Sequence, residues 1–352
     1  MAPRREGGRS PPPDEKVLVI QPLPGIGDMV WFIPHLRAIA AATPAKRISV
    51  LTKSRSFAER LVGHEDFVEE FIWIDHRHAR AHPLRAVGEI AAALKARRFS
   101  RVWIMHHSPR YALAAALAGI RERVGYGTAG LQRLFLTDKR HLPREARLHG
   151  AVERADALLR LHGIRVEDRD LHVDPDALRR IRARFGDLPR PWVGLGIGSS
   201  DPRKCWPLDR FAELAGRLAS QGPWTVFLCG AEHEADAARD IARSARRRGG
   251  APVVAVDLPL EQSVALVSDC RLFIGNDSGL MNIAASVGVA TVGLFGGGVI
   301  LDYRENLHAV VPDGLAAPSM EGISVDSVLG FIERQGLAPC ACKPAPRSRP
   351  ND

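Results

Sequence analysis

Three glycine-containing segments carry polar side chains directly after apolar runs, where a ligand could be bound. In the first segment, Gly25 and Gly27 precede Asp28, whose carboxylate could take a proton from a hydroxyl group. Asp is also a common helix N-cap residue, so a purely structural role for Asp28 is the simpler alternative. The segment lacks the third glycine of a dinucleotide-binding fingerprint. It therefore predicts close approach of a ligand to the backbone, and not a nicotinamide dinucleotide site.

The second segment begins at Gly196 and contains Ser199, Ser200 and Lys204 ahead of a predicted helix. Backbone N–H groups, two hydroxyls and an ammonium group together suit a diphosphate. The spacing is not that of a P-loop. In the simpler alternative, Lys204 is a solvated loop charge and Trp206 a packing residue.

The third segment, from Gly275 to Gly279, places Asp277 and Ser278 before an uncharged predicted helix. A carboxylate, a hydroxyl and free amide groups at a helix start suit a phosphate or sugar hydroxyls. A plain N-cap role for Asp277 is the alternative. A weaker fourth feature is Glu234, which follows another predicted strand and could accept ribose hydroxyls or simply begin a helix.

Apolar runs that predict strands alternate with helical patterns in both halves of the chain. Strands are expected at 16–20, 47–51, 68–74, 101–105 and 123–125, and then at 192–197, 224–229, 253–256, 271–274 and 290–295. Helices are expected at 28–42, 84–97 and 111–119, and then at 208–220, 232–247, 260–268, 279–287 and 325–335. This alternation predicts two Rossmann-like, doubly wound α/β domains that face a central cleft, with ligands at the carboxyl ends of their strands.

The same pattern sets the expected domain boundaries. We expect one Rossmann-like domain at 16–165 and a second at 191–337, joined by an acidic, proline-containing linker or hinge at 166–190. Residues 1–15 and 338–352 are expected to be disordered tails. Residues 1–14 contain no apolar run that could act as a signal peptide or anchor. The uncharged stretch 278–301 fits a buried helix and strand, so no transmembrane span is expected.

The positive charge is concentrated in one part of the chain. The net charge is +9, but residues 76–147 contain 15 Lys or Arg against 4 Asp or Glu. A net of +11 in this segment leaves −2 for the rest, which excludes a uniformly basic, histone-like protein and indicates one local anionic partner. The basicity could also reflect codon bias, because 42 of the 49 basic residues are Arg.

Histidines gather in the same part of the chain, at His76, His78, His82, His106 and His107. They follow no metal-binding pattern, so we interpret them as surface or phosphate-contacting residues. The five cysteines have no regular spacing, which is typical of reduced thiols. We therefore expect no metal site and no cofactor.

Taken together, the three segments resemble those of glycosyltransferase family 9, the ADP-heptose:lipopolysaccharide heptosyltransferases. The resemblance runs from about Lys16 to Gln335 and includes Lys204-x-Trp-Pro and the later Leu294-Phe295-Gly296. It implies the GT-B fold, with the acceptor on the N-terminal domain and the sugar nucleotide on the C-terminal domain. It also implies an inverting, metal-independent enzyme that moves heptose from ADP-heptose to an anionic glycolipid acceptor, the lipopolysaccharide inner core.

By the same resemblance, Asp28 corresponds to the general base and Lys204 to the group that stabilises the departing diphosphate. The implied donor-binding residues are Ser199, Ser200, Lys204, Glu234, Leu258, Asp277, Ser278, Gly279 and Asn282. Heptose-specific members commonly have His at the last of these positions, whereas Asn carries no charge. The expected acceptor-binding residues are Gly25, Gly27, Arg121, Arg123, Arg133 and Arg140, the arginines for phosphorylated sugars. We expect a cytoplasmic location, with peripheral attachment to the cytoplasmic face of the inner membrane as an option.

Three alternatives stay open at this stage. A family-9-like enzyme could use a different donor, for instance a UDP-hexose, or a different acceptor. A non-catalytic nucleotide-sugar-binding homologue is favoured by Asn282. A nucleic-acid binder is disfavoured because the basic segment lacks interleaved aromatic residues and any known module.

Overall fold

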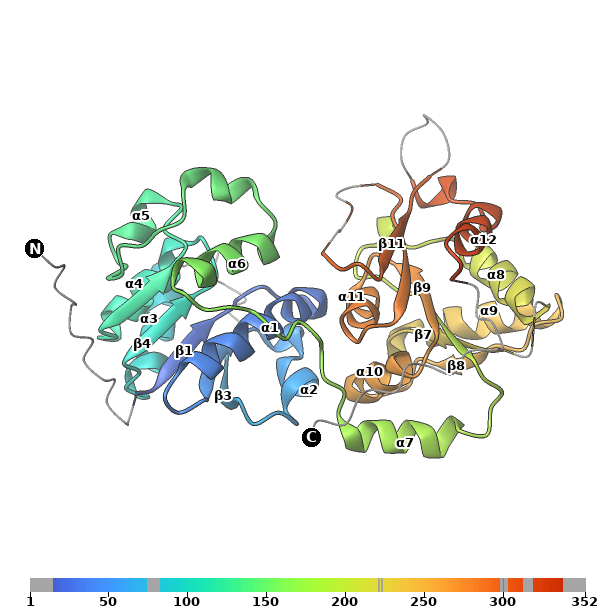
Figure 1. Ribbon diagram of the computed structural model, residues 1–352, viewed down its shortest axis with the longest axis horizontal. Helices are drawn as coiled ribbons and strands as arrows, with labels where there is room; N and C mark the ends of the chain where they lie inside the picture. The colour runs from blue at the N-terminus through green and yellow to red at the C-terminus, as the bar shows by residue number, and fades with distance from the viewer. Residues whose placement is uncertain are drawn as a thin grey trace, which may run out of the picture. The chain divides into compact units, whose positions relative to one another are not determined.

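The computed structural model describes residues 15–74, 83–220, 222, 224–297, 300, 303–312 and 319–337. Within these residues the chain forms two compact units that divide between Arg169 and Asp170. Each unit contains one parallel sheet with helices on both faces (Figure 1). We describe each unit separately and call them the first and the second unit.

The first unit has a parallel sheet of strand order β3-β2-β1-β4-β5 among its described residues. Its strands are β1 (Val17–Ile20), β2 (Ile48–Thr52), β3 (Val68–Trp73), β4 (Arg101–Ile104) and β5 (Glu122–Gly125). All four residues of β1 are apolar and buried, as expected of a central parallel strand that is covered on both faces. In register, Ile20 lies opposite Leu51 on one side and Ile104 on the other, so the carboxyl ends of these strands meet at one edge.

Helices cover the two faces of this sheet. They are α1 (Ile26–Ala42), α2 (Ala58–Val62), α3 (Pro83–Lys95), α4 (Pro109–Leu117), α5 (Gly130–Arg133) and α6 (Ala151–Leu161). Leu18 and Ile20 of β1 pack in one apolar cluster with Ile90 of α3 and Tyr111 of α4. Helices α1 and α6 pack against each other. The helices connect strands that all run parallel, so the loops that follow the strands emerge at one edge of the sheet.

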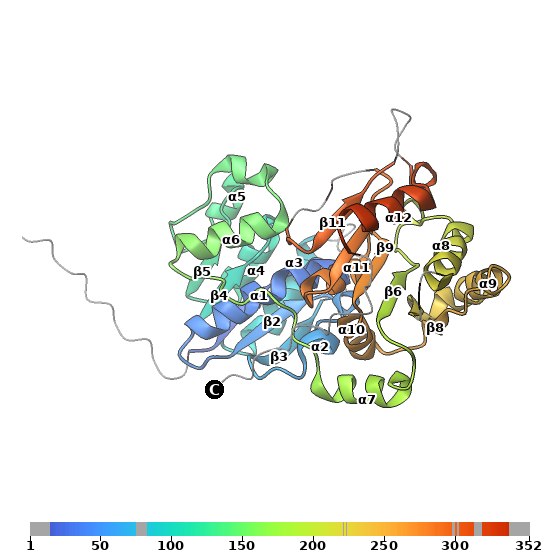
Figure 2. The same ribbon diagram turned by 45° about the vertical axis from the view of Figure 1, so that its right-hand side comes forward.

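The second unit has a parallel sheet of strand order β11-β10-β9-β6-β7-β8 among its described residues. Its strands are β6 (Trp192–Gly196), β7 (Thr225–Cys229), β8 (Val253–Ala255), β9 (Leu272–Asn276), β10 (Ala290–Leu294) and β11 (Leu307–Val310). Its helices are α7 (Pro175–Phe185), α8 (Leu208–Ser220), α9 (Ala235–Arg246), α10 (Leu260–Ser268), α11 (Gly279–Ser286) and α12 (Val325–Arg334). Figure 2 shows α8 and α9 on one side of this sheet and α10 and α11 on the other.

The predicted α/β class is confirmed, and the predicted strands match observed ones within a few residues. Helix α7 was not expected, because it lies in the stretch interpreted as a hinge. Its buried residues are Ala177, Ile181 and Phe185, a narrow stripe four residues apart that packs α7 against the second unit. Strand β11 and helix α6 were also not recognised from the sequence.

A carboxylate clasps α7 to the rest of the second unit. Asp269, just after α10, accepts hydrogen bonds from Arg182 of α7 at 2.8 and 3.0 Å and from Arg190 at 2.9 Å. Burial alone would raise the pKa of Asp269, but the two guanidinium groups outweigh it and lower the pKa below its ordinary value. The carboxylate is only 12% exposed, whereas both arginines reach solvent. The clasp therefore stabilises the ionised form of Asp269.

We expect Asp269→Asn to lower the free energy of unfolding at pH 7 by about 1–2 kcal/mol, because charged hydrogen bonds are lost. A depressed pKa adds stability above the ordinary value of 3.8 and loses it as the pH falls through the depressed value. The difference between the two proteins should thus shrink below about pH 4, as measured by urea unfolding. The control is Asp257→Asn, which removes the single exposed pair with Arg184 and should cost less than about 0.5 kcal/mol. Equal losses in the two variants would contradict the clasp.

Candidate active site

In each sheet the first strand in sequence lies in the interior. The next two strands are added on one side of it, and the remaining strands are added on its other side. This topological switch point falls between β1 and β4 in the first unit and between β6 and β9 in the second. Loops that follow two such strands diverge and leave a crevice at the carboxyl edge. Two of the three predicted segments, which contain Lys204 and Asp277, follow β6 and β9, and the third, with Asp28, follows β1.

Lys204 and Asp277 meet across the switch point of the second unit. The ammonium Nζ of Lys204 lies 2.5 Å from Oδ2 of Asp277. Ser199 donates from its hydroxyl to the carbonyl of Asp277 at 3.4 Å, while Ser200 is exposed on the same loop. A cation, a carboxylate and a hydroxyl are therefore gathered at the end of two adjacent strands, a suitable place for a phosphate group.

A buried amide holds the two loops in this register. Asn276 is fully buried; its Nδ2 donates to the carbonyl of Ile197 at 2.8 Å, and its Oδ1 accepts from the backbone of Trp206 at 3.0 Å. The Trp206 ring is 1% exposed, and its indole N–H donates to the carbonyl of Ile323. Trp206 is thus a packing residue, and Asn276 is a positioning residue that the sequence analysis did not single out.

The start of α11 differs from the simple cap considered for Asp277. Ser278 is the N-cap residue, and Gly279 is the first residue of the helix. The Asp277 carboxylate instead pairs with Lys204. The N-terminal amides of α11 therefore lie beside that pair and could donate hydrogen bonds to an anion.

Asn282, one turn into α11, is held by the protein. Its Nδ2 donates to the carbonyl of Ser278 at 2.9 Å, and its Oδ1 accepts from the Tyr303 hydroxyl at 2.6 Å. The residue is 4% exposed. Asn282 thus links the start of α11 to the segment that precedes β11.

Glu234 occupies space that two glycines leave open. Its carboxylate accepts from the backbone N–H of Ala231 at 2.7 Å and closes a capping box at a 3-10 turn. A Cβ at Gly198 or at Gly230 would overlap this carboxylate. Glu234 therefore lies between the ends of β6 and β7, on the side of the switch point away from α11. Leu258, half-buried after β8, is the next predicted donor residue along this edge.

In the first unit, Asp28 is the third residue of α1 and caps its start. Its Oδ2 accepts from the backbone N–H of Gly25 at 3.0 Å, and Gly27 lies in the same turn. A Cβ at position 25 would lie 2.7 Å from that oxygen, which explains the glycine. Burial raises the pKa of Asp28 above its ordinary value, and the Gly25 hydrogen bond opposes this effect. A half-buried carboxylate with a raised pKa is suited to accept a proton.

A cationic cluster lies at the other side of the same switch point. His106 and His107 follow β4 and stack with ring centroids 4.4 Å apart. Burial, assisted by nearby positive charges, lowers the pKa of His106 to about 3, so this ring is neutral at pH 7. The groups that act on it besides His107 are Lys53, Arg110 and Arg154. Burial also lowers the pKa of His107, with Arg154 and Arg147 contributing. We call Lys53, Arg110, Arg147 and Arg154, whose charges act on these two rings, the cationic cluster.

The four arginines predicted to bind acceptor lie elsewhere in the first unit or are already engaged. Arg121 and Arg123 lie at the amino end of β5, and Arg123 donates to the backbone carbonyls of Phe135 and Ile120. Arg140 pairs with Asp138 at 2.7 Å. Arg121 and Arg123 therefore lie at the sheet edge opposite to Asp28.

Arg133 differs from the other three because it follows the carboxyl end of β5. It donates to the carbonyls of Gly127 and Leu142 and thereby fixes the loop around α5. Of the predicted histidines, His106 and His107 join the carboxyl edge, whereas His76, His78 and His82 lie outside the described residues. The sequence contained a signal for this cluster. Lys53 follows the strand predicted at 47–51, and Arg110 precedes the helix predicted at 111–119, which are positions at the carboxyl edge.

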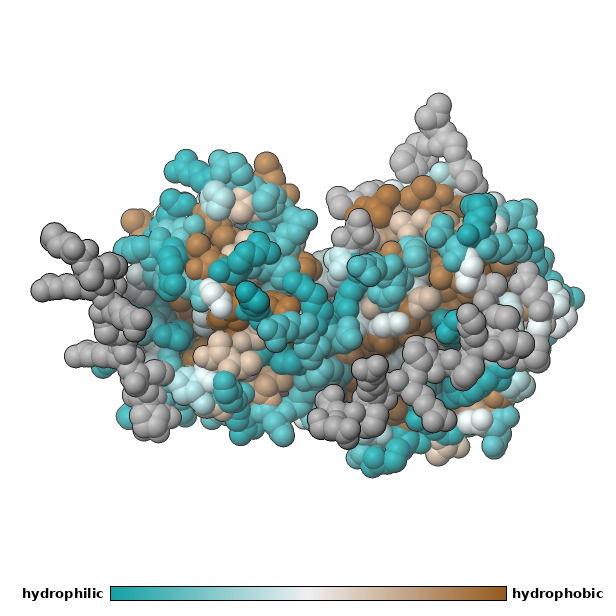
Figure 3. Space-filling model, viewed as in Figure 1, coloured by the Kyte–Doolittle hydropathy of each residue, from teal (hydrophilic) through white to brown (hydrophobic). Residues whose placement is uncertain are grey.

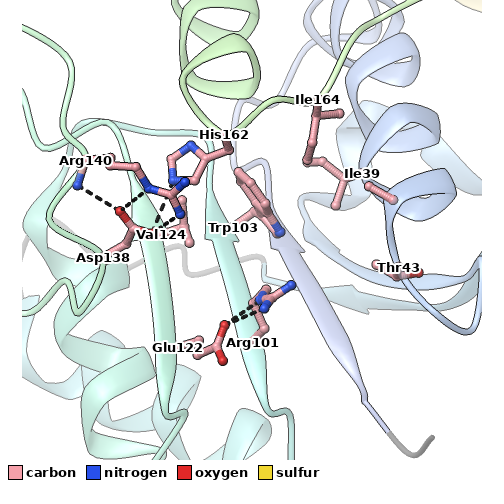
Figure 4. Close-up of a pocket in the computed structure, with 11 residues that line it drawn as sticks. Ile39, Thr43, Arg101, Trp103, Glu122, Val124, Asp138, Arg140, His162 and Ile164 are labelled. Atoms are coloured by element: carbon pink, nitrogen blue, oxygen red, sulfur yellow. Dashed lines mark hydrogen bonds and ion pairs between the residues drawn. The ribbon is translucent and has the colours of Figure 1, made fainter. Parts of the chain in front are cut away.

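The pocket drawn in Figure 4 has a volume of about 230 Å³ and lies at the amino edge of the first sheet. It contains Arg101 and Glu122, the first residues of β4 and β5, together with Asp138, Arg140 and His162. Its arginines pair with its carboxylates at 2.6–2.7 Å. These charges neutralise one another far from the switch point, so we do not assign the active site to this pocket.

The described residues hold no cluster of three His, Cys, Asp or Glu side chains suited to a metal ion. In the same part of the chain, no helix is both long and apolar enough to cross a membrane.

The chain is similar in sequence to known proteins. The sequence model of glycosyltransferase family 9 (heptosyltransferase) matches residues 87–298. The chain is 28% identical over 298 residues to lipopolysaccharide heptosyltransferase 2 of Salmonella typhimurium, which covers 80% of this chain and 82% of that protein. The Escherichia coli protein of the same name gives the same values.

Solved structures share the fold. The structure of E. coli ADP-heptose lipopolysaccharide heptosyltransferase II has a TM-score of 0.71 at 24% identity, covering 92% of this chain and 98% of that one. E. coli heptosyltransferase WaaC with ADP-2-deoxy-2-fluoro heptose has a TM-score of 0.70 at 19% identity, covering 91% and 99%. The expected GT-B fold, with two Rossmann-like units, is confirmed.

The contact between Gly198 and Glu234 predicts a stability effect that a second substitution relieves. Gly198→Ala should lower the free energy of unfolding by about 1–3 kcal/mol, because its methyl group overlaps the carboxylate. In the double variant with Glu234→Ala the overlap is gone, so Gly198→Ala should add almost nothing to the cost of losing the cap. Urea unfolding of all four proteins measures the coupling.

The matched control is Gly330→Ala in α12, where the added methyl group approaches only the flexible end of Arg334. It should not destabilise the protein, since Ala favours a helix over Gly. Additive costs for Gly198→Ala and Glu234→Ala would contradict the fit of the carboxylate to the glycines.

Proposed function

The chain belongs to glycosyltransferase family 9 (heptosyltransferase), as its motifs predicted, and we propose that it transfers heptose from ADP-heptose to the inner core of lipopolysaccharide. The observation that carries this proposal is the Ser199, Lys204 and Asp277 cluster at the switch point of the second unit. Two relatives named lipopolysaccharide heptosyltransferase 2 support the acceptor class. The solved relative bound to an ADP-heptose analogue supports the donor.

Donor binding is assigned to the second unit. The diphosphate would lie at the start of α11, where Ser199, Ser200 and Ser278 offer hydroxyls and Gly279 a backbone amide. Lys204 would neutralise the diphosphate and take it as a partner in exchange for Asp277. Glu234, beside Leu258, would accept the ribose hydroxyls, and its capping bond holds it in place beforehand.

The Asp277 carboxylate gains a separate role once Lys204 turns to the phosphate. A carboxylate at the start of α11 can accept hydrogen bonds from sugar hydroxyls but repels the phosphate itself. It would therefore bind the hydroxyl groups of the heptose, while Lys204 binds the diphosphate. This division explains why a carboxylate and a cation sit together at this edge.

The proposed reaction inverts the anomeric centre without a metal. The acceptor hydroxyl oxygen attacks the anomeric carbon of heptose from the face opposite to the diphosphate. The new carbon–oxygen bond forms as the bond to the diphosphate breaks, and ADP leaves with the electron pair. Asp28 receives the hydroxyl proton on Oδ1, because Oδ2 is held by Gly25. Lys204 stabilises the charge on ADP, which makes a metal ion unnecessary.

For the acceptor we propose the cationic cluster, which replaces Arg121 and Arg123 in this role. The cluster lies at the same sheet edge as Asp28, whereas those two arginines lie at the opposite edge. Guanidinium groups bind phosphate and carboxylate oxygens in pairs, so they suit phosphorylated acidic sugars. Arg133 supports this edge by fixing the loop around α5.

A different donor sugar is the second candidate function, and Asn282 favours it. Both its amide atoms bond within the protein, to Ser278 and Tyr303. A thermal-shift panel of ADP-heptose, other ADP-sugars and UDP-sugars separates the donors, since a bound ligand raises the melting temperature. Product formation from any acceptor would exclude a non-catalytic binding homologue.

We expect Asp28→Asn to lower kcat about 10²–10⁴-fold with little change in donor affinity, because general-base catalysis is lost. Asn keeps an oxygen for Gly25, so the fold should be retained. In the unmodified enzyme, kcat/KM should fall as acid protonates Asp28, at a pH above the ordinary carboxyl pKa of 3.8. Mass spectrometry of the glycolipid product measures transfer.

The control for this variant is Glu153→Gln. Glu153 closes the same kind of capping box at Gly150 on α6, with a distance of 3.2 Å, but lies outside the proposed site. It should leave kcat unchanged. Near-normal turnover by Asp28→Asn would remove Asp28 as the base.

Lys204→Met should lower kcat about 10²–10³-fold, because the departing diphosphate loses its cation. The control is the neighbouring Arg203→Met, since Arg203 is 89% exposed and pairs with Asp201. Lys204→Arg should restore part of the rate. Equal effects of Lys204→Met and Arg203→Met on kcat would assign a general loop role, not a leaving-group role, to this cation.

A further inference from the structure

His35, in the middle of α1, is a fully buried histidine that uses both of its ring nitrogens. The residue is 0% exposed. Its Nδ1 lies 3.1 Å from the carbonyl oxygen of Trp31, one turn earlier in the helix. Its Nε2 lies 2.9 Å from Oδ1 of Asp156, which belongs to α6. The ring therefore joins α1 to α6 from inside the first unit.

The two partners of His35 determine its charge. A carbonyl oxygen can only accept a hydrogen bond, and the same holds for an ionised carboxylate. Burial would raise the pKa of Asp156, but the hydrogen bonds from His35 and Arg169, together with the charges, lower the pKa below its ordinary value. Asp156 is thus ionised at neutral pH, and both ring nitrogens of His35 must donate. A histidine that donates from both nitrogens carries a positive charge.

Arg169 binds the same carboxylate from the solvent side. Its Nη2 lies 2.9 and 3.0 Å from the two oxygens of Asp156, and its side chain is 42% exposed. We call His35, Asp156 and Arg169 the α1–α6 clamp. Figure 3 shows hydrophilic and hydrophobic side chains interspersed on the face of the first unit that carries α6, so this surface does not reveal the charge of His35 beneath it. Loss of one partner would leave a buried charge uncompensated, so the clamp holds the two helices firmly.

The clamp joins two helices that begin at the sheet edge proposed for catalysis. Figures 1 and 2 both show α6 beside α1, in agreement with their packing. The two helices end together, because Thr43 after α1 and His162 after α6 line the same pocket at the amino edge (Figure 4). They therefore run in the same direction, and both begin at the carboxyl edge.

Each of these helices carries one residue of the proposed site in its first turn. Asp28 is the third residue of α1, and Arg154 of the cationic cluster is the fourth residue of α6. His35 follows Asp28 by seven residues, which is about two turns along the same face of α1. Asp156 follows Arg154 by two residues. A displacement of α6 relative to α1 would therefore change the distance between the proposed base and this cation.

We propose that His35 is a positioning residue for transfer: as a buried imidazolium it holds α6 on α1 and thereby sets Arg154 relative to Asp28. An acceptor bound by Arg154 then presents its hydroxyl to the base. His35 is buried and acts only through Asp156. The inference rests on the proposed function, which gives Asp28 and Arg154 their roles. The charge of His35 does not depend on transfer, so the two can fail separately.

The first test measures the charge of His35 in the unmodified full-length protein. A long-range ¹H–¹⁵N NMR spectrum at pH 7 distinguishes ring nitrogens that carry a proton from those that do not. His35 should show two protonated nitrogens. His106 is the neutral reference with one, because its pKa is lowered to about 3. His35→Gln removes the His35 signal and Asp156→Asn shifts it, so either variant identifies it, and a neutral His35 ring would overturn the proposal.

The second test measures transfer by variants of the clamp. His35→Phe keeps a ring in the core but makes neither bond, so kcat/KM for the acceptor should fall about 10- to 100-fold, as expected when a reacting group is misplaced. Donor affinity should not change, because the donor is assigned to the second unit. Asp156→Asn should give a similar loss, and the double variant should lose no more than either single one. His35→Gln, which can still donate to Asp156, should recover part of the rate.

The matched control is His162→Phe. His162 also bonds through Nδ1 to a carbonyl one turn earlier, that of Leu158 at 2.9 Å, and its side chain is only 4% exposed. It lies beside Trp103 at the amino edge, outside the proposed site. This variant should keep the acceptor kcat/KM of the unmodified enzyme. Thermal melting establishes that each variant is folded, and where His35→Phe is not, His35→Gln and Asp156→Asn provide the kinetic comparison.

The outcomes separate the positioning role from a general structural one. An equal kinetic loss in His162→Phe, weaker donor binding in His35→Phe, or additive losses in the double variant would overturn the positioning role. A protein that transfers heptose but fails these tests refutes this inference alone. A protein that transfers no sugar to any acceptor refutes the proposed function, whatever the charge of His35.

Discussion

The pairing of β6 with β9 is the constraint on which the chemistry of the second unit depends. In register, Gly196 lies opposite Gly275, and the missing side chains let the backbones of the two loops approach closely. Asn276 then joins both loops through one buried amide. An unpaired buried amide would be costly, so this arrangement locks the loops in a single register. The contact between Lys204 and Asp277 follows from that lock.

Much of the fold could be predicted because its signals are local. Strand β1 is a run of four apolar residues, and the glycines and polar residues after β6 and β9 mark the carboxyl edge. Helix α7 could not be recognised in the same way, since its apolar stripe is narrow and its partner α10 comes much later in the sequence. Its stability depends on packing and on the Asp269 clasp, neither of which is a local property.

The acceptor side shows a similar limit for charge. The excess of positive charge in the first half of the sequence indicated an anionic partner, but charge counts do not say at which edge of a sheet a residue lies. Both Arg123 and Arg154 donate to backbone carbonyls, but Arg123 lies at the amino end of β5, whereas Arg154 lies in α6 and its charge acts on His106 after β4. The position of Arg154 depends on how α6 packs against α1, a long-range contact absent from any motif.

The choice between cap and catalyst, which the sequence left open for Asp28, is not a real opposition. A capping box uses one carboxylate oxygen, Oδ2, and thereby fixes the direction of the other. The hydrogen bond from Gly25 also favours the ionised form, while burial favours the neutral one. Burial outweighs the hydrogen bond and raises the pKa of Asp28, so this carboxylate binds a proton more readily than an exposed one. Glu234 repeats the device with Ala231 in the second unit, where we propose a fixed hydrogen-bond acceptor instead of a base. A cap is therefore a means of orienting a functional carboxylate, and its presence supports the functional interpretation as much as the structural one.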